Sequence, residues 1–305
     1  MTEISMKQLR YFEALARHGH FGRAAEACAV SQPALSMQVK ELEESLRAPL
    51  VERGARQIRL TPLGEELARR ARDILQAVDE LDELARSSQN LLSGRLRMGV
   101  IPTVAPYLLP AVITRAAERF AELELLPRET MTQKLVADLV EGRLDTAIVA
   151  LPVSEPALEE RALFDEEFVL VRPARDRAKA LPTLQALREM RLLLLEEGHC
   201  FREQALSFCQ MPSHPPRDLI EGSSLTTLVQ MVGAGLGVTL IPQMAVPLET
   251  RCATVCVARL PEPRPSRTIG MIWRRTSPLS AQLDQVAQLV REAGLAAVTA
   301  GLDGA

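Results

Sequence analysis

No stretch of this sequence is apolar enough to cross a membrane. Among its 305 residues, no uninterrupted apolar segment approaches the roughly 18 residues that a spanning helix requires. The N-terminal segment, MTEISMKQLRYF, lacks the extended apolar core of a secretory signal peptide. We therefore expect neither export nor membrane association, and we predict a cytoplasmic protein.

Cysteine is sparse, and its spacing does not indicate a structural metal site. The five cysteines are an odd number, and a chain in a reducing cytosol keeps its thiols free, so any disulfide should be transient and regulatory. Gly233, Gly235 and Gly237 follow a predicted helix rather than a strand, which argues against a dinucleotide-binding fingerprint. The sequence therefore predicts neither a metal nor an organic cofactor.

The chain as a whole also lacks a net positive charge. Its formal net charge is −3, unlike that of a protein that coats nucleic acid over its whole surface. The first 61 residues differ, because they contain nine Lys and Arg residues against seven Asp and Glu residues. A slightly basic N-terminal segment on an acidic remainder is compatible with a DNA-binding head on a regulatory body.

Three short helices are predicted in this N-terminal segment. Apolar periodicity indicates helices over 6–17 and 22–28, and Ser31 and Pro33 supply an N-cap and a first-turn proline for a third helix over 32–46. The buried stripe of the third helix comprises Leu35, Val39, Leu42 and Leu46. Residues able to contact DNA lie at its start and on its other face: Ser31, Gln32, Pro33, Ser36, Gln38 and Lys40. Such a helix enters the major groove in helix–turn–helix proteins.

An arginine-bearing hairpin is predicted after the three helices. Residues 49–60 place Arg53, Arg56 and Arg59 around Gly54. A solvated basic loop would have the same composition, but the order of three helices followed by this hairpin favours a winged helix whose arginines contact phosphates.

A long helix is predicted from Thr61 onward. Thr61 is its N-cap, Pro62 occupies the first helical position, and acidic residues follow in the first turn. Apolar residues recur close to a seven-residue period on one side: Leu63, Leu67, Ile74, Val78, Leu81 and Ala85. This period is typical of a two-helix seam, so we predict that the chain dimerises through this helix.

From Arg95 onward, predicted strands and helices alternate. Strands are expected at 96–100, 123–126, 144–151, 168–171, 192–195, 238–241 and 269–273. Helices are expected at 103–120, 134–141, 183–190, about 224–232 and 280–293. This alternation predicts parallel sheets with ligands at the carboxyl ends of the strands.

The stretch LLLLEEGHCFREQALSFC contains two cysteines with different expected roles. Cys200 follows a buried strand at the start of a predicted helix, beside His199 and Arg202. The helix dipole and neighbouring cations favour the thiolate, which is the reactive form of cysteine. Cys200 is therefore a candidate peroxide-reactive thiol.

Cys209 lies nine residues further along the same helix. An intact helix would hold the two α-carbons roughly 13 Å apart, whereas a disulfide needs about 4.4–6.8 Å. The two thiols can therefore join only if the intervening helix unwinds, which predicts a redox switch. Two half-buried helix cysteines remain an alternative. A zinc site with His199 and His214 is disfavoured, because the Cys-x8-Cys gap lacks the short spacing of such sites.

The N-terminal run MKQLRYFEALARHGHFGRAAEACAVSQPALSMQVKELEESLRAPLVERGARQIRLTPLGEEL resembles the DNA-binding head of the LysR-type transcriptional regulators. The remainder is similar to the peroxide-sensing branch of that family through MGVIPTVAPYLLP, LFDEEFVL, LLLLEEGHCFREQALSFC, VGAGLGVTLIP and PEPRPSRTIG. The resemblance covers essentially the whole chain. It is interrupted after Cys209, where MPSHPPRDLIEG departs from the family pattern.

The resemblance implies a multidomain fold. It combines a winged helix–turn–helix DNA-binding domain over 1–61, a linker helix over 62–92 and an α/β regulatory domain over 93–305. The regulatory domain would consist of two subdomains like those of periplasmic binding proteins, one formed by about 93–165 and 269–305 and the other by about 166–268. The resemblance also implies a homotetramer on promoter DNA.

The resemblance further assigns roles to individual residues. Cys200 would be the peroxidatic cysteine and Cys209 the resolving cysteine. The matching polar residues of the pocket would be His199, Arg202, Thr103 and Thr132, with Arg267 as a supporting contact. Cys28, Cys252 and Cys256 have no assigned role, although Cys252 and Cys256 leave a second redox pair open.

Together, these observations predict a transcriptional regulator rather than an enzyme. Peroxide would oxidise Cys200, a disulfide with Cys209 would follow, and a changed spacing of the DNA-binding heads would recruit or release RNA polymerase. Thioredoxin or glutaredoxin would reduce the disulfide. The alternatives are a LysR-type regulator that binds a metabolite between its regulatory subdomains, and a thiol peroxidase, which the DNA-binding head disfavours.

Overall fold

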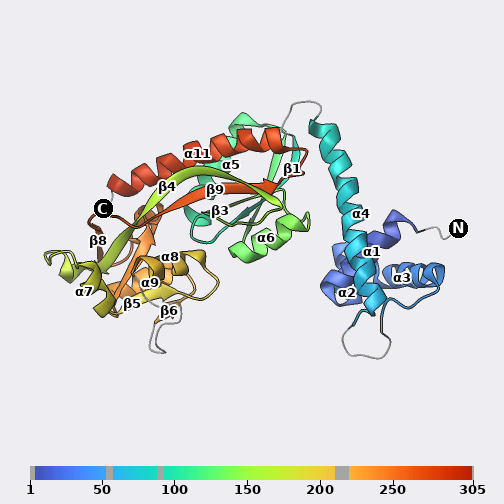
Figure 1. The fold of residues 1–305 in the computed structure, drawn as a ribbon, viewed down its shortest axis with the longest axis horizontal. Helices are drawn as coiled ribbons and strands as arrows, with labels where there is room; N and C mark the ends of the chain where they lie inside the picture. The colour runs from blue at the N-terminus through green and yellow to red at the C-terminus, as the bar shows by residue number, and fades with distance from the viewer. Residues whose placement is uncertain (1–3, 53–57, 88–92, 210–219, 304–305) are drawn as a thin grey trace. The chain divides into compact units, whose positions relative to one another are not determined.

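The computed structural model describes residues 4–52, 58–87, 93–209 and 220–303 (Figure 1). The chain divides into two compact units, Met1–Ala85 and Arg86–Ala305. The division falls within the predicted linker helix. In the described ranges, no helix is both long and apolar enough to cross a membrane.

The first unit begins with the three helices that the sequence predicts. They are α1 (Met6–His18), α2 (Phe21–Ala27) and α3 (Gln32–Leu46). Phe12, Leu15, Leu35 and Leu42 are completely buried where the helices meet. The N-cap of α3 is Ser31, whose hydroxyl accepts a hydrogen bond from the Ala34 N–H. The local capping signal therefore located this helix correctly.

A short antiparallel bridge between Val51 and Leu60 follows α3. The Glu52 N–H donates to the Arg59 carbonyl oxygen at 2.9 Å, so the two flanks of the predicted wing are paired. Arg53 and Arg56 lie outside the described residues, and the predicted contacts of these two arginines with DNA stay a prediction.

The long helix α4 spans Pro62–Ser87. Its first turn is capped as predicted, because the Thr61 hydroxyl accepts a hydrogen bond from the Gly64 N–H at 3.0 Å. Leu63, Ile74 and Leu81 are 47%, 46% and 63% exposed. Large apolar side chains in such a row are candidates for contact with a second helix, and the predicted dimer seam is compatible with their exposure.

The second unit is built on a mixed sheet with the strand order β2-β1-β3-β9-β4-β7-β5-β6, and β8 pairs with β4 beside this path. The strands are β1 (Gly94–Val100), β2 (Leu123–Glu129), β3 (Thr146–Leu151), β4 (Leu158–Pro173), β5 (Leu192–Leu195), β6 (Glu221–Gly222), β7 (Val238–Pro242), β8 (Val255–Arg259) and β9 (Ser266–Arg274).

The prediction of parallel sheets is only partly correct. β1 pairs in parallel with β2 and β3, and β5 pairs in parallel with β6 and β7. β9, however, is antiparallel to both β3 and β4, and β4 is antiparallel to β7 and β8. The sequence pattern missed β6 and β8 and recognised only residues 168–171 of the 16-residue β4. Strand direction is set by nonlocal pairing, which alternation along the chain does not reveal.

Helices cover the sheet and enclose two cores (Figure 1). They are α5 (Ala105–Arg119), α6 (Thr132–Val140), α7 (Leu184–Glu189), α8 (Cys200–Phe208), α9 (Leu225–Gly233), α10 (Val246–Glu249) and α11 (Ser280–Asp303), with short 3-10 turns η1 (Ala174–Asp176) and η2 (Gln243–Ala245). Core I is packed beneath α5, α6 and α11, and core II beneath α8 and α9.

The chain passes between the two cores along β4 and β9. Leu163 and Phe164 of β4 belong to core I, and Phe168 of the same strand belongs to core II. β4 pairs with β9 from Leu158 to Glu167 and then with β7 and β8. The two halves of this unit therefore share one continuous strand, and the crossing near residue 165 lies at their boundary.

Candidate functional site

Cys200 is the first residue of α8, directly after a buried strand. The four leucines of β5 are buried, Glu196 and Glu197 are exposed, and Gly198 adopts a left-handed conformation with φ +97°. His199 is the N-cap of α8. A residue with a Cβ would be strained at Gly198, so glycine allows the sharp turn that places the thiol at a helix N-terminus.

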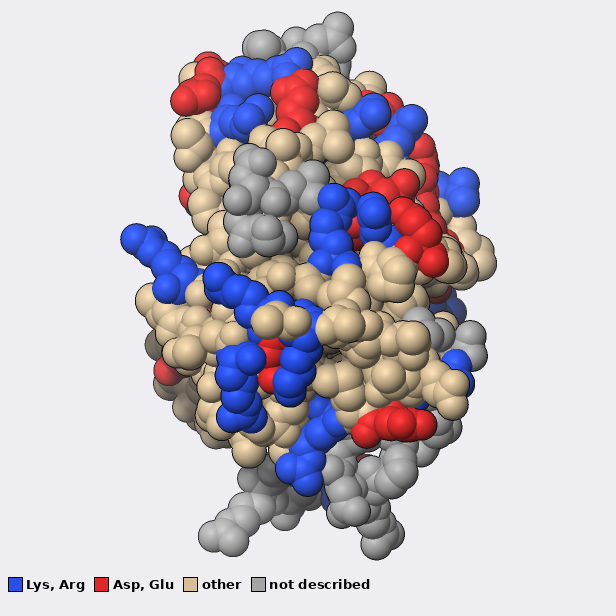
Figure 2. Space-filling model, turned by 90° about the vertical axis from the view of Figure 1, so that its left-hand side faces the viewer, with Lys and Arg blue, Asp and Glu red and all other residues tan. Residues whose placement is uncertain are grey.

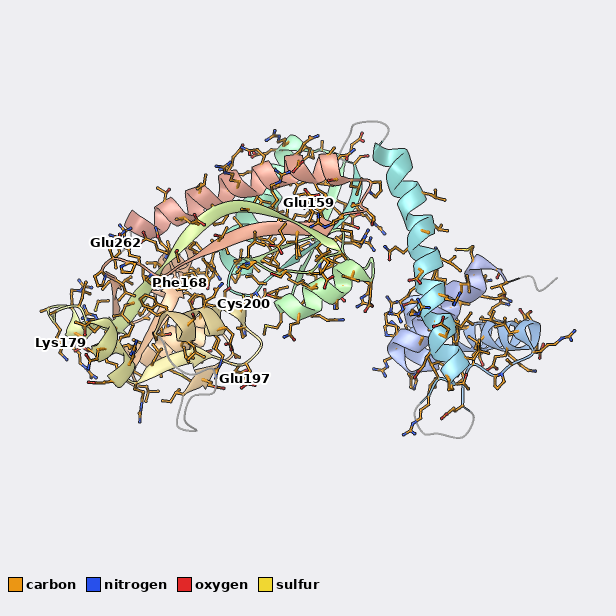
Figure 3. The ribbon with its side chains drawn as sticks, in the orientation of Figure 1. Glu159, Phe168, Lys179, Glu197, Cys200 and Glu262 are labelled. Carbon is orange, nitrogen blue, oxygen red and sulfur yellow. The ribbon has the colours of Figure 1, made fainter. Side chains whose placement is uncertain are left out.

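The thiol lies on the boundary between the two cores. Although α8 contributes to core II, half-buried Cys200 packs against core I. Gly198 approaches Met131, which precedes α6, from the other side of this boundary. Figure 3 shows Cys200 on the side of α8 that faces α6. The cysteine is thus at a place where a small molecule would be surrounded by residues of both halves.

A buried ion pair joins the two strands that cross between the halves. Arg267 on β9 donates through Nε and Nη2 to Glu166 Oε2 on β4, at 2.9 and 2.8 Å. Its Nη1 donates to the Thr103 hydroxyl at 2.8 Å, and the Met244 N–H donates to Glu166 Oε1. Burial raises the pKa of Glu166, whereas Arg267 and the Met244 amide oppose that rise.

The same guanidinium connects this ion pair to α8. It lies 5.4 Å from the centre of the Phe201 ring, within the range of a cation–π contact. Phe201 also packs edge-on against Phe168, with ring centres 4.7 Å apart. Because Phe201 follows Cys200 directly, these contacts fix the N-terminal end of α8. Thr103 and Arg267 therefore lie together beside this end, and their role in a peroxide pocket stays a prediction.

A second polar contact spans the two halves. The Tyr107 hydroxyl on α5 donates to Glu249 Oε1 on α10 at 2.6 Å, and the Tyr107 ring contacts both cores. Burial is the main cause that raises the pKa of Tyr107, and the bond to Glu249 adds to it. The phenol therefore stays protonated and acts as a hydrogen-bond donor.

Thr132 is the first residue of α6. Its hydroxyl is buried and has no hydrogen-bond partner in the structure. A buried hydroxyl without a hydrogen-bond partner lowers the stability of most proteins, so such groups often bond to a ligand or a water molecule. Thr132 immediately follows Met131, the residue that Gly198 approaches. Thr132 therefore lies near the boundary with free hydrogen-bonding capacity, and its role in a peroxide pocket stays a prediction.

The structure corrects the expected role of His199. The side chain is buried, and burial lowers the pKa of the ring below its ordinary value of 6.5, against the smaller opposing effect of Glu196. The imidazole is therefore neutral at pH 7. His199 lies beside Cys200 as predicted, but it is not the cation that the sequence interpretation placed there.

Arg202 also differs from its prediction. Its Nη1 donates to the Leu195 carbonyl oxygen and to Glu221 Oε1, each at 2.7 Å. The guanidinium thereby links α8 to the ends of β5 and β6 instead of being directed at the thiol. Because Arg202 is two positions after Cys200, it projects from a different face of the helix. We therefore assign Arg202 a structural role, which is to hold α8 against β5 and β6.

Cys209 is the C-cap residue of α8 and is completely buried in core II. Burial raises the pKa of its thiol to about 11, and the positive charge of Arg188 partly counteracts this rise. Arg188 Nε donates to the Cys209 carbonyl oxygen at 2.8 Å. Both Cys200 and Cys209 are free thiols, at opposite ends of one helix.

The remaining cysteines do not join this site. Cys28 is half-buried at the end of α2, and burial raises the pKa of its thiol. Cys252 is exposed, whereas Cys256 is buried and donates to the Pro173 carbonyl oxygen. His214 lies outside the described residues. Among the described residues, no cluster of His, Cys, Asp and Glu could hold a metal ion.

The exposed face of α3 is the candidate DNA-binding surface. Most of the predicted residues are exposed: Ser31, Gln32, Pro33, Ser36 and Lys40. Gln38 is instead half-buried, and its amide donates to Glu41 at 2.6 Å, so its side chain is already engaged. Met37 is 56% exposed on the same face, and sequence reasoning did not select it. Arg59 is also exposed.

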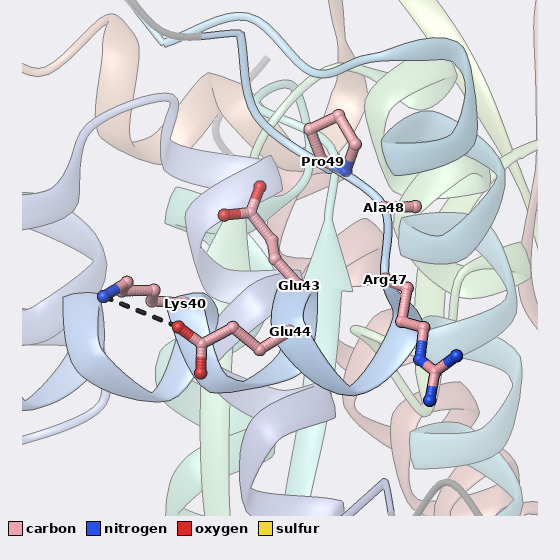
Figure 4. A pocket seen from close by; sticks show the side chains of 6 residues that line it. All are labelled: Lys40, Glu43, Glu44, Arg47, Ala48 and Pro49. Atoms are coloured by element: carbon pink, nitrogen blue, oxygen red, sulfur yellow. Dashed lines mark ion pairs between the residues drawn. The ribbon is translucent and has the colours of Figure 1, made fainter.

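The C-terminal end of α3 is shaped for contact with the wing rather than for a ligand. Glu43 Oε1 accepts hydrogen bonds from the N–H groups of Leu50 and Val51, which fixes the start of the hairpin. The shallow hollow beside it contains the ion pair of Lys40 and Glu44 (Figure 4). These contacts hold the hairpin in a defined position relative to α3.

Sequence reasoning missed three residues at the boundary of the two cores: Glu166, Phe201 and Tyr107. Glu166 lies in the acidic run DEE, where nothing in the pattern distinguishes the buried carboxylate from exposed Asp165 and half-buried Glu167. Phe201 carries no signal in the sequence beyond being an apolar residue near the start of a predicted helix. The signal that could have found Glu166 is the need of a buried arginine, Arg267, for an acidic partner.

Comparison with known proteins agrees with this architecture. The family model of bacterial regulatory helix-turn-helix proteins of the lysR family matches residues 6–65, and that of the LysR substrate binding domain matches residues 89–295. The chain is 44% identical over 294 residues to a Streptomyces viridosporus protein named "Probable hydrogen peroxide-inducible genes activator", covering 95% of this chain and 94% of that relative.

Solved structures are similar over nearly the full length. Full-length OxyR from Pseudomonas aeruginosa, with one cysteine replaced by aspartate, has a TM-score of 0.75 and 38% identity, covering 95% of each chain. A cysteine-to-serine mutant of Corynebacterium glutamicum OxyR with bound hydrogen peroxide has a TM-score of 0.69 and 34% identity, covering 99% of this chain and 96% of that one. The chain therefore belongs to the LysR family of DNA-binding transcriptional regulators, and within it to the OxyR branch.

Proposed function

We propose that this protein is a redox-responsive transcriptional regulator that senses hydrogen peroxide through Cys200. The observation that carries the proposal is the position of the Cys200 thiol: it is half-buried at the N-terminus of α8, on the boundary of two cores, and shares that helix with a second free cysteine. The start of α8 directs backbone N–H groups toward this position, where they can interact with the negative charge of an attacking sulfur. The membership of this chain in the OxyR branch supports hydrogen peroxide as the signal.

The chemistry proceeds in two balanced steps. The Cys200 thiolate attacks one peroxide oxygen, the O–O bond breaks, and the departing hydroxide takes up a proton and leaves as water, so that Cys200 becomes a sulfenic acid. The Cys209 sulfur then attacks the Cys200 sulfur, the S–O bond breaks, and a second water leaves. Peroxide is the oxidant, and the two thiols supply two electrons.

Buried polar groups at the boundary would position the peroxide. The unpaired Thr132 hydroxyl can donate to or accept from a peroxide oxygen. The Thr103 hydroxyl accepts from Arg267 and keeps its own proton to donate. Arg267 is held by Glu166, so its charge is fixed near the place where negative charge develops on the leaving oxygen.

The second step requires α8 to unwind. Its length places the α-carbons of Cys200 and Cys209 roughly 13 Å apart, and a disulfide requires about 4.4–6.8 Å. One or both cysteines must therefore leave their positions, and we expect Cys209 to leave core II, which changes the packing of Phe201 and Leu206 beside it. Oxidation of the two thiols is thereby converted into a local refolding of α8.

The refolding would alter how the regulatory units of an oligomer pack together. The chain would dimerise through α4 and form a tetramer, and the changed packing would alter the spacing of the DNA-binding heads over promoter DNA and thus the recruitment of RNA polymerase. Thioredoxin or glutaredoxin would restore the two thiols in the cytoplasm. No cofactor takes part.

Disulfide mapping by mass spectrometry tests the proposal when it is combined with DNA footprints. After a short pulse of dilute peroxide, the full chain should contain a Cys200–Cys209 disulfide, and its footprint on promoter DNA should change in extent. Reduction with a dithiol should restore the first footprint. Peroxide-insensitive footprints, together with a melting shift on addition of a small metabolite, would instead favour a metabolite-responsive regulator.

A further inference from the structure

The C-terminal end of α8 is held by an arginine from a neighbouring helix. Arg188 is in the last turn of α7, and its Nε donates to the Cys209 carbonyl oxygen at 2.8 Å. A helix C-terminus presents carbonyl groups without helical partners and is the negative end of the dipole, so a guanidinium there stabilises the helix. The bond exists only while Cys209 remains the C-cap of α8.

We propose that Arg188 is a latch on the reduced state: it binds the Cys209 carbonyl group while α8 is intact and releases it when the Cys200–Cys209 disulfide forms. This inference rests on the proposed function, because it assigns a role within the same switch. Arg188 is a positioning residue, since it contacts the backbone of Cys209 and neither peroxide nor a reacting sulfur atom.

The geometry links the latch to the redox equilibrium. An intact α8 separates the two cysteines by roughly 13 Å, so one or both must move by several ångströms, and the latch requires that Cys209 leaves its place in core II. The hydrogen bond from Arg188 therefore stabilises the dithiol form and is absent from the disulfide form. A contact made in only one of two states shifts their equilibrium by its own free energy.

The surroundings of Arg188 provide a matched control. Figure 2 shows Lys and Arg side chains gathered over the end of the regulatory unit that carries α7 and β8. Arg191 is exposed and follows Arg188 by three residues, and none of the hydrogen bonds described joins its side chain to Cys209. Replacing Arg191 removes the same charge from the same surface without removing the latch.

The test compares the dithiol–disulfide equilibrium of the full-length wild type, Arg188→Met, Arg188→Lys and Arg191→Met in buffers of reduced and oxidised dithiothreitol. Loss of one hydrogen bond at a partly exposed site should shift the Arg188→Met equilibrium toward the disulfide by about three- to tenfold. That change makes the reduction potential about 15–30 mV more negative, at about 30 mV per tenfold change. Arg188→Lys retains a cation and a donor and should lie between wild type and Arg188→Met.

Thermal unfolding provides a second readout. Arg188→Met should lower the melting temperature of the reduced protein more than that of the disulfide form, whereas a merely structural residue would lower both equally. Equal reduction potentials for wild type and Arg188→Met, or an equal shift in Arg191→Met, would overturn the latch. Should Arg188→Met fail to fold, Arg188→Lys must still show a smaller shift in the same direction.

The outcome for the wild type separates the two proposals. If wild type forms no Cys200–Cys209 disulfide with peroxide, the proposed function fails and the latch fails with it. If wild type forms the disulfide and Arg188→Met titrates identically, only the latch is wrong.

Discussion

The two ends of α8 differ in almost every property that matters for a thiol. The Cys200 end is half-buried, faces the boundary of two cores and is bordered by the fixed pair of Arg267 and Glu166. The Cys209 end is completely buried in one core, and burial raises the pKa of its thiol to about 11. The first end is arranged for reaction with a small molecule, and the second for reporting that reaction through loss of packing.

This separation places recognition and conformational change at different points of one helix. A reactive cysteine that was itself a core residue would be shielded from peroxide, and a resolving cysteine on the surface would remove less core packing when it joined. Substitutions that remove the features of one end test whether the two ends of α8 have these different roles.

The largest effect is expected from the two cysteines themselves. Cys200→Ser should abolish both oxidation and the change of footprint while leaving DNA binding by the reduced form intact. Cys209→Ala should still be oxidised at Cys200, but without a partner the sulfenic acid should advance to sulfinic acid. Intact mass and peptide mapping after peroxide distinguish the two. An unchanged peroxide response in Cys200→Ser would contradict the assignment.

The next effect concerns the ion pair that fixes the Cys200 end. Arg267→Met leaves the Glu166 carboxyl buried without its cation, and the free energy of unfolding should fall by about 3–5 kcal/mol. The double variant Arg267→Met with Glu166→Gln removes both charges and should be less destabilised than the sum of the single variants. Urea unfolding of the full chain measures these differences. Strict additivity would show that the two side chains do not stabilise each other.

The smallest effect is a pH dependence at His199. Burial lowers the pKa of the folded-state ring below its ordinary value, so the unfolded chain binds a proton more readily as the pH falls through 6.5. Stability should therefore decrease as the pH drops from 7 toward 5. His199→Gln should flatten this slope in unfolding experiments, with His18→Gln as a control on the DNA-binding unit. An unchanged slope would mean that His199 does not titrate differently in the folded state.

The parts of the fold that local sequence determines were predicted well. Ser31, Thr61 and the four leucines 192–195 gave the starts of α3 and α4 and the bounds of β5, because caps and apolar runs act over a few residues. The antiparallel pairing of β4 with β9 was not predicted, since it joins segments about 100 residues apart. Only the family resemblance singled out Thr103 and Arg267, because no local pattern can bring together two residues that lie 164 positions apart.

The side chains of the candidate site were likewise predicted only where local sequence determines their position. The sequence located Cys200 at a helix N-terminus correctly, because a glycine turn and a helical period are local features. It could not show that His199 would be buried and neutral, or that Arg202 would bond to Glu221. Direction and burial of a side chain depend on which elements pack against it, and those elements come from distant parts of the chain.

The continuous β4 strand has a mechanical consequence for the regulatory unit. Its pairs with β9 lie at residues 158–167, and its pairs with β7 and β8 lie at residues 168–173. Each half of the unit is therefore joined to β4 by its own set of backbone hydrogen bonds, and β4 exchanges partners between Glu167 and Phe168. Because Phe201 of α8 packs on Phe168, any refolding of α8 acts directly on the strand at this junction.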